Sequence, residues 1–308
     1  MLEPATQQYW LTVAAAFLAC EALYHASHFC INKTATSLKA TDRATLALKV
    51  VNIVHAAISG PVAFYFLFLD GDAATAHAVQ RAVALDAEFA PSLFSAHIAA
   101  DQALSLTCYT VGFMCWDLYR IDTWAKSGHG EKKLLIVHHV LSILVWPLAS
   151  LYRVAGPFLL HYEYTELSSP FLAVVDAARD YPKIAEKYPI TNEICRVMFA
   201  IVFYIVRIFG WFPVSYCFWR DALYLLFNND AAMHTMPKWV PAFWLFTHGF
   251  LTCLQVCLLC LITFVASTAR GVRHSIATQV WWGYLILKAV YAMATGDEEA
   301  RKNEAKNA

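Results

Sequence analysis

Long apolar stretches recur along the whole chain and restrict its fold more than any other feature. Seven of them reach the roughly 20 residues that an α-helix needs to cross the hydrocarbon core of a bilayer. Only 15% of the residues are charged, against the roughly 25% typical of soluble proteins. The pattern predicts an all-α, polytopic transmembrane helical bundle, with spans at 8–30, 49–69, 103–122, 134–152, 155–177, 193–227 and 239–267.

Two stretches depart from the simple pattern. The stretch 193–227 is too long for one straight span, and we expect a kinked or interfacial piece around Pro213. An eighth apolar stretch, 276–294, has Trp281 and Trp282, which suit a membrane interface, and the sequence leaves open whether it also spans. We divide the chain into an N-terminal span with its loop (1–44), a helical bundle (45–268) and a C-terminal apolar segment with a charged tail (269–308).

Charged residues predict the orientation of the bundle. The connections after the first, third and fifth spans carry basic residues, namely Lys33, Lys39, Arg43, Lys49, Lys126, Lys132, Lys133, Arg179, Lys183 and Lys187. The connections between them are acidic or nearly uncharged, so the positive-inside rule puts the basic loops in the cytosol and the N-terminus on the other side. The formal net charge of +0 excludes a nucleic-acid-binding protein, because no basic excess is left to meet phosphates.

Ionisable residues inside the spans lie at a common depth. Counting a rise of roughly 1.5 Å per residue from the cytosolic end puts His55, Asp117, His138 and His139 about 6–8 Å into the membrane, on three different helices. Two carboxylates of the fifth span lie deeper, Glu166 about 17 Å in and Glu163 one turn beyond. Residues at this depth are functional candidates by default, because burying their charge costs free energy.

This polar layer has two interpretations. Its members either pair with one another to hold the helices together, or they supply imidazoles and carboxylates for acid–base or nucleophilic chemistry. Adjacent His138 and His139 point about 100° apart on a helix, so we predict no metal site. Arg207 in the sixth span is open to the same choice between helix pairing and substrate binding.

Four motifs resemble those of the TLC domain family, which includes the ceramide synthases, the TRAM proteins and smaller TLC domain-containing proteins. They are the His of Lys49-Val-Val-Asn-Ile-Val-His55, the Asp of Gly112-Phe-Met-Cys-Trp-Asp117, the His138-His139 pair, and Glu166-Leu-Ser-Ser-Pro-Phe171. Asn192 followed by Ile205-Val-Arg207-Ile adds to the resemblance. The chain has one HH pair and is more similar to the smaller TLC domain-containing proteins than to the ceramide synthases, which have two.

The resemblance implies a lipid pocket inside a multi-pass protein of the endoplasmic reticulum or a related endomembrane. It leaves two functions open, and whether the protein is an enzyme is undecided between them. The first is an acyltransferase that moves an acyl chain from acyl-CoA to a sphingoid or glycerophospholipid acceptor, with no bound cofactor. The second is a non-catalytic lipid-binding or lipid-homeostasis protein. Under either function, we expect the partners of the protein to be membrane lipids and acyl-CoA. The sequence indicates no oligomeric state.

Each candidate residue receives a role under the first of these functions. We predict His138, His139 and Asp117 as catalytic residues. The predicted substrate-binding residues are His55, Glu163, Glu166, Ser169 and Arg207.

The depths also predict contacts. At least one His–Asp pair of the layer should meet at roughly 2.6–3.2 Å or through one water. Side chains lean toward the N-terminus of their helix, which for Glu166 is away from the layer. We therefore expect Glu166 to bond elsewhere, unless Pro170 distorts the helix.

Overall fold

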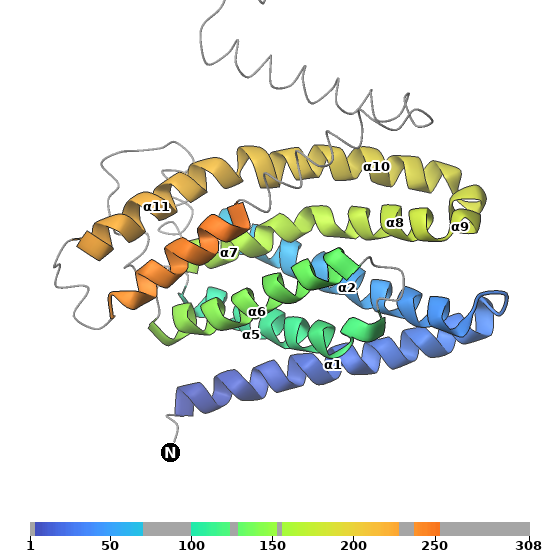
Figure 1. Ribbon diagram of the computed structural model, residues 1–308, viewed down its shortest axis with the longest axis horizontal. Helices are drawn as coiled ribbons and strands as arrows, with labels where there is room; N and C mark the ends of the chain where they lie inside the picture. Colours follow the sequence, from blue (N-terminus) through green and yellow to red (C-terminus); the bar gives the residue numbers. More distant parts are fainter. Residues whose placement is uncertain (1–3, 70–99, 124–128, 153–155, 228–236, 253–308) are drawn as a thin grey trace, which may run out of the picture. The chain divides into compact units, whose positions relative to one another are not determined.

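The computed structural model describes residues 4–69, 100–123, 129–152, 156–227 and 237–252, and these residues are helical with short turns. Contacts divide the chain into two units, Met1–Gly249 and Phe250–Ala308, and the fold below is that of the first. The helices of its N-terminal half are α1 (Pro4–Thr34), α2 (Ala40–Phe68), α5 (Ala100–Tyr119), the 3-10 turn η1 (Ile121–Thr123) and α6 (His129–Tyr152) (Figure 1).

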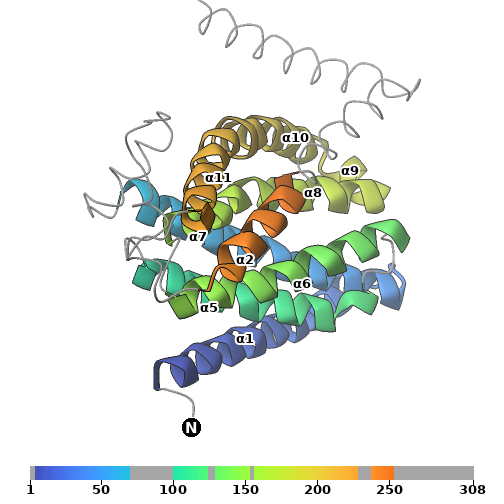
Figure 2. The same ribbon diagram turned by 60° about the vertical axis from the view of Figure 1, so that its left-hand side comes forward.

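The second half is built from shorter and less regular pieces. They are α7 (Gly156–Tyr164), the 3-10 helix η2 (Thr165–Ser168), α8 (Ser169–Asp180), α9 (Pro182–Lys187), α10 (Pro189–Phe203), the π-helix η3 (Tyr204–Phe209), α11 (Trp211–Phe227) and a helix over 239–252. The elements α7, η2 and α8 form one nearly continuous helical run, and α10, η3 and α11 form another. In Figures 1 and 2 the second run lies alongside the first.

The all-helical prediction is confirmed for the described residues, and a helix or helical run lies over the described part of each of the seven predicted spans, in the seventh as far as residue 252. Two of these runs are long and apolar enough by themselves to cross a membrane, Ala40–Phe68 and Pro189–Tyr224, and Leu135–Leu148 is a shorter apolar helix. The number of spans therefore stays a prediction. The stretch 276–294 lies outside the described residues.

Helix α2 is the centre of the bundle. It packs against α1, α5, α7 and α8, and the small or apolar residues Ala47, Leu48, Val51 and Ala63 are almost completely buried on it. A Cβ atom on Gly60 would lie 2.7 Å from the backbone nitrogen of Leu167, so only glycine permits η2 to approach α2 this closely. Candidate residues on α2 are thereby held next to those on α5 and α7.

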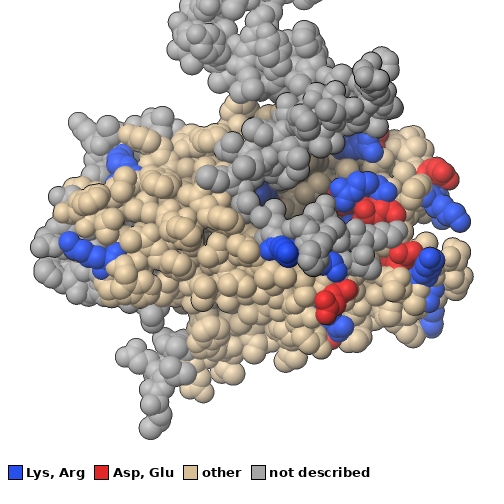
Figure 3. Space-filling model, viewed as in Figure 1, with Lys and Arg blue, Asp and Glu red and all other residues tan. Residues whose placement is uncertain are grey.

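The turns after α1, α5 and α8 meet at one end of the bundle. The Tyr181 hydroxyl donates to the carbonyl of Asp42 at 3.0 Å, and the Thr45 hydroxyl donates to the carbonyl of Thr123 at 2.9 Å. Most of the charged side chains on the face in Figure 3 gather at this end, and a broad uncharged surface separates them from the few at the other end. The three connections that the sequence predicts to be cytosolic are thus on the same side of the bundle.

The irregularity of the sixth predicted span lies earlier than expected. The α-helix gives way to a π-helix at Tyr204–Phe209, whereas Pro213 lies inside the first turn of α11. A proline is tolerated there, because the first N–H groups of a helix have no partner within it. Pro213 has no backbone N–H to donate, and the start of α11 at Trp211 puts it where none is needed. The distortion therefore lies upstream, in Tyr204–Phe209.

Candidate functional site

A histidine and an aspartate of the predicted layer meet in the interior. His139 lies on α6 and Asp117 on α5, and both residues are buried. The Nε2 atom of His139 is 2.9 Å from Oδ2 of Asp117, which is an ion-pair distance, although the two groups are not aligned as in a standard hydrogen bond. The predicted His–Asp contact is confirmed. The other ring nitrogen of His139, Nδ1, is buried and has no hydrogen-bond partner.

The third histidine of the layer reaches this pair through an aromatic ring. His55 on α2 is buried and stacks on Phe113 of α5, with ring centroids 3.7 Å apart and planes within 5°. The Phe113 ring centroid is in turn 6.5 Å from that of His139. The Nδ1 atom of His55 is buried without a hydrogen-bond partner. The layer is therefore continuous across α2, α5 and α6, and Phe113 is a member of it that the sequence did not indicate.

His138 occupies a different position from its neighbour. It is only partly buried, its ring centroid is 5.4 Å from that of His139, and the two planes are inclined by 67°. It lies within electrostatic range of Glu166 and Arg207. The two adjacent imidazoles thus face different partners, as the angle between neighbouring helical residues requires. Within the described ranges no three His, Cys, Asp or Glu side chains form a group that could hold a metal ion.

Glu166 and Arg207 connect the two irregular segments. The Nη2 atom of Arg207 in η3 is 3.3 Å from Oε1 of Glu166 in η2. The same guanidinium donates to the hydroxyls of Ser168 at 3.1 Å and Ser169 at 3.4 Å. We infer that the unwound segments permit this contact, because they turn side chains that a regular helix would direct elsewhere.

The helix is interrupted just before Pro170. From the sequence, Glu166 was expected to reach the layer only if the helix was distorted at this proline. The α-helix ends at Tyr164 and restarts at Ser169, with Pro170 in its first turn. Glu166 lies within electrostatic range of His55 and His138 and so borders the layer, while its ion pair is with Arg207. Arg207 takes the helix-pairing role, and its binding of a substrate stays a prediction.

Glu163 lies deeper than the layer and faces two hydroxyl groups. It is 2% exposed on α7, and its carboxyl group interacts with Thr110 of α5 and Ser59 of α2. Sequence reasoning had missed Ser59 and Thr110. Spacing could have found them, because Ser59 follows His55 by one helical turn and Thr110 precedes Asp117 by two, so each lies on the same helical face as a residue of the layer.

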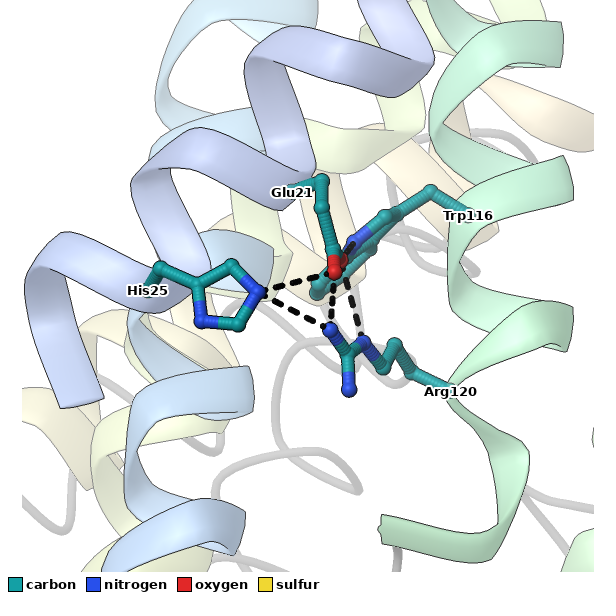
Figure 4. Close-up of polar contacts among 4 residues, drawn as sticks. All are labelled: Glu21, His25, Trp116 and Arg120. Carbon is teal, nitrogen blue, oxygen red and sulfur yellow. Dashed lines mark hydrogen bonds and ion pairs between the residues drawn. The ribbon is translucent and has the colours of Figure 1, made fainter.

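A second polar cluster lies on the side of α5 that packs against α1 (Figure 4). The carboxylate of Glu21 on α1 accepts hydrogen bonds from the indole of Trp116 at 2.8 Å and from Nε of Arg120 at 3.0 Å. His25 approaches the same carboxylate at 3.0 Å, and Arg120 stacks over the ring of Tyr24. Here the polar groups satisfy one another, and the arrangement fastens α1 to α5.

Comparisons with known proteins give one result. The family model described as the TLC domain of TRAM, LAG1 and CLN8 proteins matches residues 46–263. No curated protein and no solved structure matches significantly. The matched region includes every candidate residue named above for the layer and its surroundings, and it excludes the Glu21 cluster's contribution from α1.

Proposed function

The chain belongs to the TLC domain family, and from this premise we propose that it is a multi-pass membrane protein that transfers acyl chains to a lipid acceptor. The domain indicates a function related to membrane lipids. The finer proposal is acyl transfer from acyl-CoA to the amine of a sphingoid base or the hydroxyl of a glycerophospholipid, in the endoplasmic reticulum or a related endomembrane.

The observation that carries the proposal is the buried pair of His139 and Asp117. A carboxylate next to one ring nitrogen fixes the tautomer of an imidazole and stabilises its cation. With Nε2 facing Asp117, the Nδ1 atom of His139 is left without a protein partner. This arrangement suits a general base whose second nitrogen is held in place for proton transfer.

The chemical step follows from this geometry. Nδ1 of His139 takes the proton of the acceptor amine or hydroxyl while that nitrogen or oxygen attacks the thioester carbonyl. A bond forms between the acceptor and the acyl carbon, and the carbon–sulfur bond breaks. The imidazolium, stabilised by Asp117, then returns the proton to the departing thiolate, so that free CoA leaves as its thiol.

The surroundings support this assignment of roles. His138 and the Glu166–Arg207 pair border the layer and are suited to hold the polar part of a lipid, together with Ser169 and His55. The end of the bundle nearest the layer carries exposed Lys183 and Lys187, whose charge would attract the phosphates of a cytosolic acyl-CoA.

A second function is favoured by a different observation. More buried polar atoms lack a hydrogen bond of standard geometry than a catalytic pair needs, among them Nδ1 of His55 and both carboxyl oxygens of Glu163. Such an excess fits a non-catalytic protein whose polar residues cap a bound lipid headgroup. Both functions require a lipid in the bundle, and only the catalytic one requires turnover.

Purified full-length protein in lipid nanodiscs tests the proposal. Labelled acyl-CoA is supplied with a panel of sphingoid bases and lysophospholipids, and the acylated product is quantified. Transfer with at least one acceptor is expected, and His139→Ala should reduce it to background. His25→Ala is the matched control, since this histidine is exposed on α1 and outside the layer.

Native mass spectrometry of the same samples separates the two functions. Turnover that depends on His139 supports the enzyme. A co-purified lipid whose amount falls in His139→Ala, with no transfer to any acceptor, would replace the enzyme with the lipid-binding protein. If neither product nor bound lipid were detected, both proposed functions would be wrong.

A further inference from the structure

Three polar residues form a second level beneath the catalytic layer. Glu163 comes from α7, Ser59 from α2 and Thr110 from α5, and all three are buried. Ser59 lies four residues beyond His55, and Thr110 lies seven residues before Asp117. At a rise of roughly 1.5 Å per residue, these offsets put the level about 6–10 Å further into the membrane than the layer.

The polar atoms of this level are incompletely satisfied. The carboxyl group of Glu163 interacts with the Ser59 and Thr110 hydroxyls. Yet neither carboxyl oxygen, nor either hydroxyl oxygen, takes part in a hydrogen bond of standard geometry. A buried polar group without such a bond costs about 1–3 kcal/mol. These four atoms, on three helices, contact one another and have hydrogen-bonding capacity left that a further polar group would use.

The chemistry of the level restricts what that group is. Two hydroxyls and a carboxyl group can each accept a hydrogen bond, and the hydroxyls can also donate one. A ligand hydroxyl would donate to Glu163 and accept from Ser59 or Thr110. A cationic headgroup is disfavoured at this depth, because charge near the middle of a bilayer costs several kcal/mol. The guanidinium of Arg207 is engaged by Glu166.

We propose that Glu163, Ser59 and Thr110 bind a hydroxyl group on the hydrocarbon chain of the lipid, several carbons from its reactive carbonyl. The inference rests on the proposed function in one respect, since a chain must extend from the layer toward this level. It adds a substrate class to that function. Chains hydroxylated in mid-chain would be preferred over unsubstituted chains of the same length.

A positional series of hydroxy fatty acids tests the inference. Full-length protein in nanodiscs is incubated with equal amounts of an unsubstituted fatty acid and one isomer hydroxylated near the carboxyl group, in mid-chain or near the methyl end. Native mass spectrometry gives the ratio bound. The mid-chain isomer should be preferred about 5–30-fold, as a gain of about 1–2 kcal/mol implies, and the other isomers less than 2-fold.

Isosteric variants assign the preference to these residues. The double variant Ser59→Ala, Thr110→Val should lose the preference for the mid-chain isomer and still bind the unsubstituted chain. Glu163→Gln should reduce the preference by itself. Thr107→Val is the matched control, because Thr107 lies one turn away on the same helix and its hydroxyl is satisfied by the carbonyl of Ala103.

The outcomes separate this inference from the proposed function. Binding of fatty acids with no preference for any hydroxyl position would overturn the inference and leave the proposed function intact. An undiminished preference in the double variant would overturn the assignment to these residues. If the wild-type protein bound no fatty acid, neither the inference nor a lipid chain in the bundle would stand.

Discussion

The two faces of helix α5 carry similar residues in opposite states. On one face, Arg120 and Trp116 donate to Glu21 of α1, and the groups satisfy one another at a partly exposed position. On the other face, Asp117 meets His139 in the interior, where a ring nitrogen is left without a partner. A satisfied cluster stabilises the fold and has nothing left to offer a ligand. An unsatisfied one costs stability, and that cost is explained if a ligand completes it.

The substitution Asp117→Asn should have the largest effect and separates the two faces most directly. An amide keeps the shape of the carboxylate but can neither hold the same tautomer of His139 nor stabilise its cation. We expect acyl transfer to fall about 10²–10⁴-fold, with little change in the thermal unfolding midpoint. The measurement is initial rate in nanodiscs beside a thermal melt. A protein that melts much earlier but is fully active while folded would show that both faces of α5 are structural.

Gly112→Val tests the satisfied face. A Cβ atom on Gly112 would lie 2.5 Å from the carbonyl oxygen of Val13 and 2.6 Å from Cβ of Ala16, so α1 must move away from α5. Overpacking of this kind costs about 1–3 kcal/mol, which a lowered thermal midpoint would report. Gly249→Val is the control, because among the described residues its Cβ would meet only the flexible side chain of Trp219, at 3.2 Å. An unchanged midpoint in Gly112→Val would mean that α1 contributes little to the bundle.

The polar contacts across α5 could be predicted only in part, for a physical reason. His139 and Asp117 follow from depth, since both lie a similar number of residues from a cytosolic turn. Glu21 and Arg120 are equally close in depth, but their contact depends on α1 lying beside α5, and no periodicity in the sequence states which helices are neighbours. Phe113 was missed because an aromatic side chain in a span is ordinarily assigned to lipid or core packing.

The irregular segments show the same limit. The irregularity expected around Pro213 is present but lies upstream of it, and the distortion expected only conditionally at Pro170 lies just before that residue. The residues that unwind are Tyr204–Phe209 and Thr165–Ser168, which contain no helix breaker of their own. The unwound segments are joined by the ion pair of Arg207 with Glu166, a contact between residues far apart in the sequence, and such long-range contacts are absent from local sequence patterns.

Glu21→Gln removes the charge from the satisfied cluster without changing its shape. Arg120 and Trp116 then lose a charge-assisted acceptor, and we expect a loss of about 1–2 kcal/mol in the free energy of unfolding. The rate of acyl transfer by the folded protein should stay within about 2-fold of the wild type, because Glu21 bonds to Trp116, Arg120 and His25, none of which has a role in the proposed transfer. Glu186→Gln, at an exposed carboxylate of α9, is the control. A selective loss of activity would make the α1 face part of the site.

Tyr181→Phe should have the smallest effect and measures one neutral hydrogen bond at the charged end of the bundle. Its hydroxyl donates to the carbonyl of Asp42 at 3.0 Å, so its loss should cost about 1 kcal/mol. Burial, with a smaller contribution from Asp42, raises the pKa of Tyr181 to about 12. Because the folded pKa is raised, the stabilisation is complete below about pH 10 and is lost as the pH rises toward 12. The difference in unfolding free energy between wild type and variant should therefore be constant from pH 6 to about pH 9 and shrink above about pH 10. The control is Tyr188→Phe, at an exposed ring, which should show no difference from the wild type at any pH. A difference that already shrank near pH 8 would mean that the hydroxyl is solvated. The bond would then give no reference value for one satisfied hydrogen bond, with which the two faces of α5 could be compared.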